Sequence, residues 1–127
     1  MVVNVSEGET RTYTRTFTKA DVRAFAELSQ DEGEQHLVAR EDGTVMVHGL
    51  LTATLPTKIG GDMDYIARRM EFTFLNPVYT DEEITCEVTI DQIEQTDGRT
   101  KLDATGRCTN EAGETVLRFE TDGVIFS

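Results

Sequence analysis

The feature that most constrains the fold is a segment near the middle of the chain that carries no Asp, Glu, Lys or Arg. This segment runs from Val45 to Thr57, and its apolar residues, which continue to Ile59, are not confined to one helical stripe. A helix that is apolar on nearly every side must be buried. Gly60-Gly61 would end such a helix, and Pro56 should kink its last turn. The sequence therefore predicts one buried helix over residues 45–59, which the rest of the chain must enclose.

Alternating segments predict the strands that enclose this helix. One such segment covers residues 10–18, and four more follow Tyr65, the last of them over residues 115–126. Thr18 and Asp21 form a capping-box pattern that opens a short helix ending near Ser29. Residues 31–43 have no clear period and predict a loop.

These elements fit into one small domain. The chain has 127 residues, of which 38% are hydrophobic, so we expect residues 1–127 to form a single domain with a packed core. The economical arrangement is α+β, with one antiparallel sheet wrapped around the buried central helix and the four later strands in a meander. This architecture is the hotdog fold.

The chain is strongly acidic and poor in lysine. Its net charge is −12, and only three of its 12 cations are lysines. A surface that binds nucleic acid must be basic, so nucleic acid is excluded as a partner. No apolar run is long enough to span a membrane and the N-terminal residues do not resemble a secretory signal, so we expect a cytoplasmic protein. An acidic, lysine-poor surface stays hydrated at molar salt, which predicts a halophilic protein; an ordinary acidic cytosolic protein is the alternative.

The two cysteines allow the register of two neighbouring strands to be predicted. Cys86 and Cys108 both lie at even positions of alternating apolar sets, so a hairpin with both sets on one face needs paired positions with an even sum. A three-residue loop from Thr96 to Gly98, with Gly98 in the left-handed region, gives the sum 194. We therefore expect Cys86 opposite Cys108, as buried free thiols. Two cysteines are too few for a zinc site or a disulfide framework.

Four segments carry a resemblance to a known family. They read FTKADVRAFAELSQD over 17–31, His36 alone, VHGLLTATLPTKIGG over 47–61 and FTFLNPVYTDEEITCEV over 72–88. On these segments the chain resembles the MaoC-like dehydratases, hotdog proteins that include the (R)-specific enoyl-CoA hydratases. The family pattern D-x-N-P-x-H reads DEGEQH here, with Asp31 and His36 at the catalytic positions and Gly33-Glu34 in place of Asn-Pro. The segment from His36 to His48 is shorter than in related hydratases, where the additional residues help to shape the acyl pocket.

The resemblance implies a role for each candidate site residue. Asp31 would hold and orient a water molecule, and His36 would exchange a proton with it. The backbone N–H of Gly49, at the start of the buried helix, would stabilise the oxyanion of a thioester. His48 would pack behind the site, and the Thr54 hydroxyl would bond Asp31 or the water.

The sequence leaves structural roles open for the same residues. Asp31 could cap the preceding helix beside a surface His36, and Gly49 could be required by close packing of the helix on the sheet. Thr54 could bond back to a helix carbonyl, as threonines in buried helices commonly do.

The activity that the resemblance implies is the interconversion of trans-2-enoyl-CoA and (R)-3-hydroxyacyl-CoA, without metal or cofactor, by a homodimer or dimer of dimers. The phosphates of CoA would need cations, for which the candidates are Arg40, Lys58, Arg68 and Arg69. A non-catalytic acyl-CoA-binding hotdog protein is one alternative. A hotdog acyl-CoA thioesterase is another, although such enzymes usually place a catalytic carboxylate on the buried helix, and residues 45–57 contain none.

Overall fold

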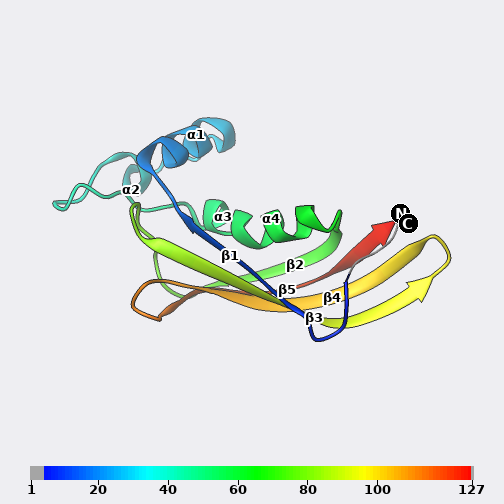
Figure 1. Cartoon of the computed structure of the whole chain (residues 1–127). Helices are drawn as coiled ribbons and strands as arrows, with labels where there is room; N and C mark the ends of the chain where they lie inside the picture. Colours follow the sequence, from blue (N-terminus) through cyan, green and yellow to red (C-terminus); the bar gives the residue numbers. More distant parts are fainter. Residues whose placement is uncertain (1–4, 127) are drawn as a thin grey trace.

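A computed structural model describes residues 5–126 of the chain, which fold into a strongly curved antiparallel sheet with helices on its concave side (Figure 1). The elements in chain order are β1 (Thr10–Thr16), α1 (Lys19–Ser29), α2 (Glu34–Leu37), α3 (Gly49–Thr52), α4 (Thr54–Asp62), β2 (Ile66–Phe74), β3 (Glu83–Thr96), β4 (Arg99–Thr109) and β5 (Thr115–Phe126). The predicted α+β class and the sheet wrapped around a central helical segment are confirmed. None of the helices within residues 5–126 is long and apolar enough to cross a membrane.

The strand order differs from the predicted four-strand meander. The sheet runs β1-β3-β4-β5-β2, so only β3, β4 and β5 form a meander, and β2 lies at the far edge beside β5. The burial pattern gives the physical reason. Strand β3 alternates between buried and accessible residues along its first half, as a central strand does, whereas β2 is exposed at every position except Phe72. A strand with so little surface to bury suits the edge, and β1 takes the other side of β3.

The central helical segment is broken where the prediction had one helix. Its first turn, α3, ends at Thr52, and α4 begins at Thr54. Pro56 accounts for the break, because proline has no N–H to bond the carbonyl of Thr52 four residues earlier and its ring crowds that carbonyl. The kink therefore lies one turn before the predicted place. At the other end, the prediction that Gly60-Gly61 ends the helix is wrong, because α4 continues to Asp62. A Cβ at Gly60 would lie 3.2 Å from the ring of Tyr65, so this glycine serves close packing of that ring.

The predicted capping box and the short helix that it opens are confirmed. Thr18 and Asp21 exchange both hydrogen bonds of a capping box, Asp21 N–H to Thr18 Oγ1 at 3.1 Å and Thr18 N–H to Asp21 Oδ2 at 2.9 Å. The helix they open ends at Ser29, as predicted. The segment expected to be a loop contains one further helical turn, α2, which carries His36.

The core lies between the concave face of the sheet and the helices. It is built from alternate residues of β3, β4 and β5 and from the apolar side chains of the helical segment, among them Leu51, Leu55 and Ile59. In Figure 1, α3 and α4 lie along the sheet, while α1 and α2 lie at the end opposite the β3–β4 turn. This places the loop between α1 and α2 beside the start of α3.

The predicted register of β3 and β4 is confirmed. Cys86 pairs with Cys108, Val88 with Gly106 and Ile90 with Ala104. Both cysteines are free and fully buried. The neighbouring Cys108 thiol, through a hydrogen bond, and burial together raise the pKa of Cys86 far above its usual range.

The predicted length of the loop that joins these two strands is wrong. Thr96 pairs with Arg99, so the turn has two residues, Asp97 and Gly98, with Gly98 at φ +72°. A two-residue loop alone would give an odd sum of paired positions. A β-bulge between Ile90 and Gln92 inserts one extra residue and restores the even sum in the part of the hairpin that contains the cysteines.

Two glycines in the sheet allow aromatic rings to lie directly on the backbone. A Cβ at Gly106 would clash with the ring of its cross-strand partner Phe119 and with the Glu87 carbonyl. A Cβ at Gly123 would clash with the Ile66 carbonyl and lie 2.8 Å from the ring of Tyr65. The rings fill the space that the missing side chains leave.

Candidate active site

The end of α1 directs Asp31 toward the start of the central helix. Gln30 adopts the left-handed conformation (φ 64°), which ends α1 and turns the chain. Asp31 then makes a local turn, in which its N–H donates to Ser29 Oγ at 3.1 Å and its Oδ1 accepts from Gly33 N–H at 3.2 Å. Its side chain remains 57% exposed, so the carboxylate is fixed by the loop and still open to solvent and ligands.

His36 is held in one orientation by a backbone carbonyl. Its side chain is 6% exposed, and its Nδ1 lies 2.7 Å from Met46 O. A carbonyl only accepts hydrogen bonds, so Nδ1 carries the proton and a neutral ring has its lone pair on Nε2. This Nε2 faces Asp31 Oδ2 at 3.9 Å and the amide nitrogen of Gln35 at 3.4 Å. A separation of 3.9 Å is too long for a direct hydrogen bond and suits one water molecule in contact with both groups.

His48 connects both members of this pair. It precedes α3, and its Nε2–H donates to Asp31 O at 2.9 Å. Its ring is stacked on that of His36, with centroids 3.7 Å apart and planes 16° from parallel, and it also contacts Phe25 at 4.9 Å. Its buried Nδ1 has no hydrogen-bond partner within the described part of the chain. These contacts bury the ring of His48 between His36 and Phe25; its role behind the site stays a prediction.

A cleft of about 380 Å³ opens beside this cluster. Its wall includes His36, Gly49 and Thr52 on one side and Phe74 with Val78 on the other. Gly49 begins α3, and a Cβ there would lie 2.8 Å from Phe74 Cε1, so the glycine permits close packing of helix on strand. Gly49 also lines the cleft, so a packing role for this glycine is compatible with the predicted role of its N–H.

The hydroxyl of Thr54 is engaged with the helix. It donates to Leu51 O at 2.5 Å, which is the back-bonding arrangement, and Thr54 does not belong to the residues that line the cleft.

The four candidate cations have different partners. The guanidinium of Arg40 lies 3.8 Å from the centre of the Tyr79 ring. Lys58 pairs with Asp62 at 2.6 Å, and this hydrogen bond raises its pKa. Arg68 and Arg69 both pair with Asp122, at 2.8 and 3.1 Å.

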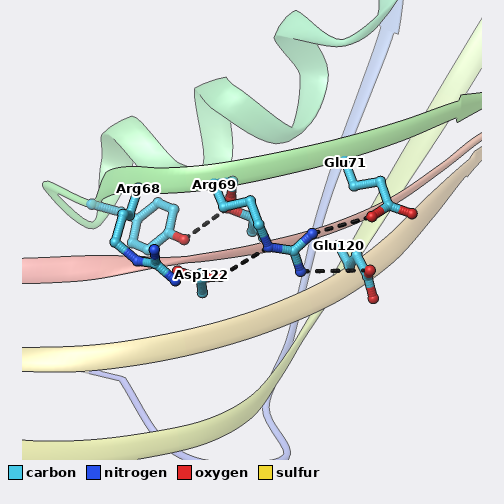
Figure 2. A network of polar contacts seen from close by, with 7 residues as sticks. Arg68, Arg69, Glu71, Glu120 and Asp122 are labelled. Atoms are coloured by element: carbon cyan, nitrogen blue, oxygen red, sulfur yellow. Dashed lines mark hydrogen bonds and ion pairs between the residues drawn. The ribbon is translucent and has the colours of Figure 1, made fainter.

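Figure 2 shows that Arg69 stands at the centre of a carboxylate network on the sheet edge, where it also contacts Glu71 at 3.1 Å and Glu120 at 3.5 Å. Neither Arg68 nor Arg69 lines the cleft beside His36. Any phosphate that approached Arg68 or Arg69 would compete with carboxylates already in place.

Asp31, His36 and His48 are also the one group within residues 5–126 whose donor atoms, all within 4.8 Å of one another, could approach a metal ion. The ring geometry does not favour such binding. A metal bound to an imidazole lies close to the ring plane, and a single ion cannot lie in both of two stacked, nearly parallel planes. Two of the four ring nitrogens also already donate to carbonyls. The arrangement suits acid–base chemistry on a water molecule.

Sequence reasoning missed three contributors to the site: Gln35, the carbonyl of Met46, and Thr52. The carbonyl has no sequence signal, because any residue at position 46 offers one. Thr52 did have a signal. It follows His48 by four residues, so on a helix it lies on the same face, one turn further along.

Similar proteins were found by comparing structures and not by comparing sequences. No family model matches the chain, and no curated protein sequence matches it. The (R)-hydratase from A. caviae involved in PHA biosynthesis superposes with a TM-score of 0.82 at 23% identity, covering 99% of this chain and 100% of that one. The MaoC-like dehydratase from Rhodospirillum rubrum gives 0.73 at 19% identity, covering 97% and 94%.

A third similar structure is a complex. The C-terminally truncated HadBC complex, a 3R-hydroxyacyl-ACP dehydratase from Mycobacterium tuberculosis, gives a TM-score of 0.67 at 15% identity and covers 97% of this chain and 99% of that one. Together these likenesses show that the chain has the hotdog fold.

Proposed function

We propose that the chain is a MaoC-like dehydratase, and that it interconverts a trans-2-enoyl thioester of CoA and the corresponding (R)-3-hydroxyacyl thioester. The observation that carries the proposal is the convergence of Asp31 and His36 on one point, 3.9 Å apart, beside a cleft that begins at the first turn of α3. Similarity of fold to hydratases and dehydratases supports the same assignment.

The proposed reaction is an addition of water in which each group has one task. Asp31 accepts a hydrogen bond from the water and orients it. His36 Nε2 takes a proton as the water oxygen forms a bond to C3, and the electrons of the C2=C3 bond shift toward the thioester oxygen. Return of a proton to C2 completes the addition, and the reverse sequence eliminates water. The reaction as proposed uses no metal and no cofactor.

Negative charge that develops on the thioester oxygen needs a hydrogen-bond donor. The N–H of Gly49 stands at the start of α3, where no intrahelical carbonyl precedes it. A preorganised donor at this point would stabilise the enolate-like transition state more than the ground state. The proposal therefore places the thioester carbonyl against the first turn of α3.

Among the candidate cations, Arg40 suits a CoA phosphate best. It lies on the turn that follows α2, four residues after His36, where its guanidinium contacts the Tyr79 ring and its charge helps to lower the pKa of Asp42. Cation–π contact leaves the outward N–H groups of a guanidinium able to bind phosphate.

We also propose that two copies pair along β2. This edge strand exposes Ile66, Met70 and Phe74, at 56%, 38% and 52% of their surfaces, beside unpaired backbone groups. An exposed apolar edge invites another strand, and a second copy would bury it by extending the sheet. Light scattering should give a dimer or a dimer of dimers; a 14.2 kDa monomer at molar salt would contradict the proposal.

One spectrophotometric experiment separates the functional alternatives. Crotonyl-CoA is mixed with the protein while the absorbance of the enoyl thioester and the release of free thiol are both followed. A hydratase lowers the absorbance without releasing thiol, a thioesterase releases thiol, and a non-catalytic binding protein does neither. The absence of a carboxylate from residues 45–57 favours the first outcome over the second.

Variants then test the assigned residues. Asp31→Asn and His36→Ala should each lower turnover by about 10²-fold or more, the scale of general acid–base contributions. Asp64→Asn, which changes an exposed carboxylate in the turn between α4 and β2, is the matched control and should keep the wild-type rate. If both site variants retain near-wild-type turnover, the assignment of Asp31 and His36 is wrong.

A further inference from the structure

Thr52, in the last position of α3, has a buried hydroxyl that lacks a hydrogen-bond partner. The residue is 3% exposed, and within the described part of the chain nothing bonds its Oγ1. Its helical neighbours behave differently. Thr54 donates to Leu51 O and Thr57 donates to Thr54 O at 2.9 Å, so back-bonding is the ordinary arrangement in this segment. Thr52 departs from it.

The position of this hydroxyl is next to the proposed chemistry. Thr52 lines the same cleft as His36 and Gly49, and its N–H bonds the carbonyl of His48 at 3.0 Å, which places it one turn above that residue. In a helix the Cα–Cβ bond tilts toward the N-terminus, so the side chain of Thr52 extends back toward Gly49. Much of the remaining cleft wall is apolar, including Val47, Phe74 and Val78.

An unpaired buried hydroxyl destabilises a folded protein, whereas valine has nearly the same shape and no polar group to satisfy. The hydroxyl therefore contributes nothing to the stability of the free protein through hydrogen bonding. The hydroxyl can donate to an acceptor that enters the cleft, once the groups that cover its Oγ1 in the free protein shift.

We propose that the Thr52 hydroxyl donates a hydrogen bond to the thioester carbonyl oxygen of the bound substrate, as a second donor beside Gly49 N–H. This inference rests on the proposed function. The carbonyl oxygen is the acceptor because it belongs to the same conjugated unit as C3, and C3 must lie at the water held by Asp31 and His36. A donor aimed at this oxygen strengthens as charge accumulates there, so it acts on turnover more than on substrate affinity.

The test compares Thr52→Val, which removes the hydroxyl, with Thr52→Ser, which retains it. Thr52→Val should lower kcat for crotonyl-CoA by about 10²-fold, the usual effect of losing one such donor, and raise KM by only about fivefold, the effect of one hydrogen bond in the ground state. Its melting temperature should stay equal to that of the wild type or rise by about 2–4 °C, because an orphaned polar group is gone. Thr52→Ser should retain kcat within about threefold, because the donor is preserved.

Two results would overturn the inference. Wild-type kcat in Thr52→Val means that the hydroxyl makes no contact in the transition state. A Thr52→Val protein whose melting temperature falls by several degrees shows that the hydroxyl has a structural partner, such as a buried water molecule.

Failure of the proposed function is seen separately, as absent turnover in the wild type. Binding of butyryl-CoA, which cannot be hydrated, then tests whether the Thr52 hydroxyl contacts the thioester carbonyl. Binding weakened about fivefold or more in Thr52→Val and normal in Thr52→Ser supports the contact, since one hydrogen bond is worth about this factor. Equal binding in all three proteins refutes it.

Discussion

Substitution of His48 tests whether the site depends on a side chain that does not touch the reacting atoms. His48→Phe keeps a ring between His36 and Phe25 but removes the Nε2–H that donates to Asp31 O at 2.9 Å. His48→Gln keeps an amide donor at a similar distance from the backbone and removes the ring. The first variant should loosen the Asp31 loop, and the second should loosen His36.

The size of the effects follows from these contacts. One neutral hydrogen bond contributes a net of about 1 kcal/mol to stability, so His48→Phe should change the melting temperature by only a few degrees. Its effect on catalysis should be larger, because a displacement of about 1 Å in a catalytic group costs about 10²-fold in rate. We expect kcat to fall by about 10–100-fold, with the protein still folded.

A double-mutant cycle identifies the route of the effect. If His48→Phe acts by displacing the Asp31 carboxylate, it should add almost nothing once that carboxylate is already inactive in Asp31→Asn. His48→Gln should still lower the residual rate in the same background. The assay is hydration of crotonyl-CoA by the four proteins of each cycle. Equal fold-losses from His48→Phe in the wild-type and Asp31→Asn backgrounds would refute the positioning role.

Further predictions concern substrate binding, acid stability, the thiols and salt. Arg40→Ala should raise KM for a CoA thioester about threefold to tenfold with kcat retained, whereas Arg99→Ala, at the exposed β3–β4 turn, should change neither in steady-state kinetics. The hydrogen bond from the Thr18 backbone lowers the pKa of Asp21, so its carboxylate stabilises the fold at neutral pH and this contribution is lost as pH falls below about 4. Asp21→Asn should therefore melt below the wild type at pH 7, and the difference should shrink in acid; a constant difference would contradict this. Because both thiols are fully buried and the pKa of Cys86 is raised, neither cysteine should react with an aromatic disulfide reagent at pH 8 until denaturant unfolds the chain, and the double Cys→Ala variant should retain activity. With a net charge of −12, the melting temperature should rise between low and molar KCl; a flat response would argue for an ordinary acidic protein.

The sequence predicted best where a local rule acts alone. The capping box of Thr18 and Asp21 is a contact between residues three apart, and the alternation of β3 and β4 fixes which side chains share a face. For the cysteine pairing, parity required an even sum of paired positions, and the assumed three-residue loop set that sum at 194. The pairing survived the wrong loop length because burial of both apolar sets requires an even sum, and the bulge beside Ile90 supplies it.

Strand order and contacts between distant segments could not be predicted from local patterns. The position of β2 at the far edge depends on which neighbours remain available after β1 has paired with β3, and no local pattern contains that information. In the candidate site, Asp31 and His36 were selected through the resemblance of the DEGEQH segment to a family pattern, because their spacing alone fits a structural role equally well. The stacking of His48 on His36 could not be predicted, because it requires the chain to return from α2 to α3 within a dozen residues and to place two rings face to face.

The rings that lie on glycines have an evolutionary consequence. At positions 106 and 123, the rings of Phe119 and Tyr65 fill the space that a side chain at the glycine would need. Neither the glycine nor its ring can therefore be enlarged freely while the other is kept. A chain that acquires alanine at 106 needs a smaller residue than phenylalanine at 119, and it must also move the strand away from the Glu87 carbonyl. Substitutions at these positions should thus appear in relatives as linked changes, with the ring lost first.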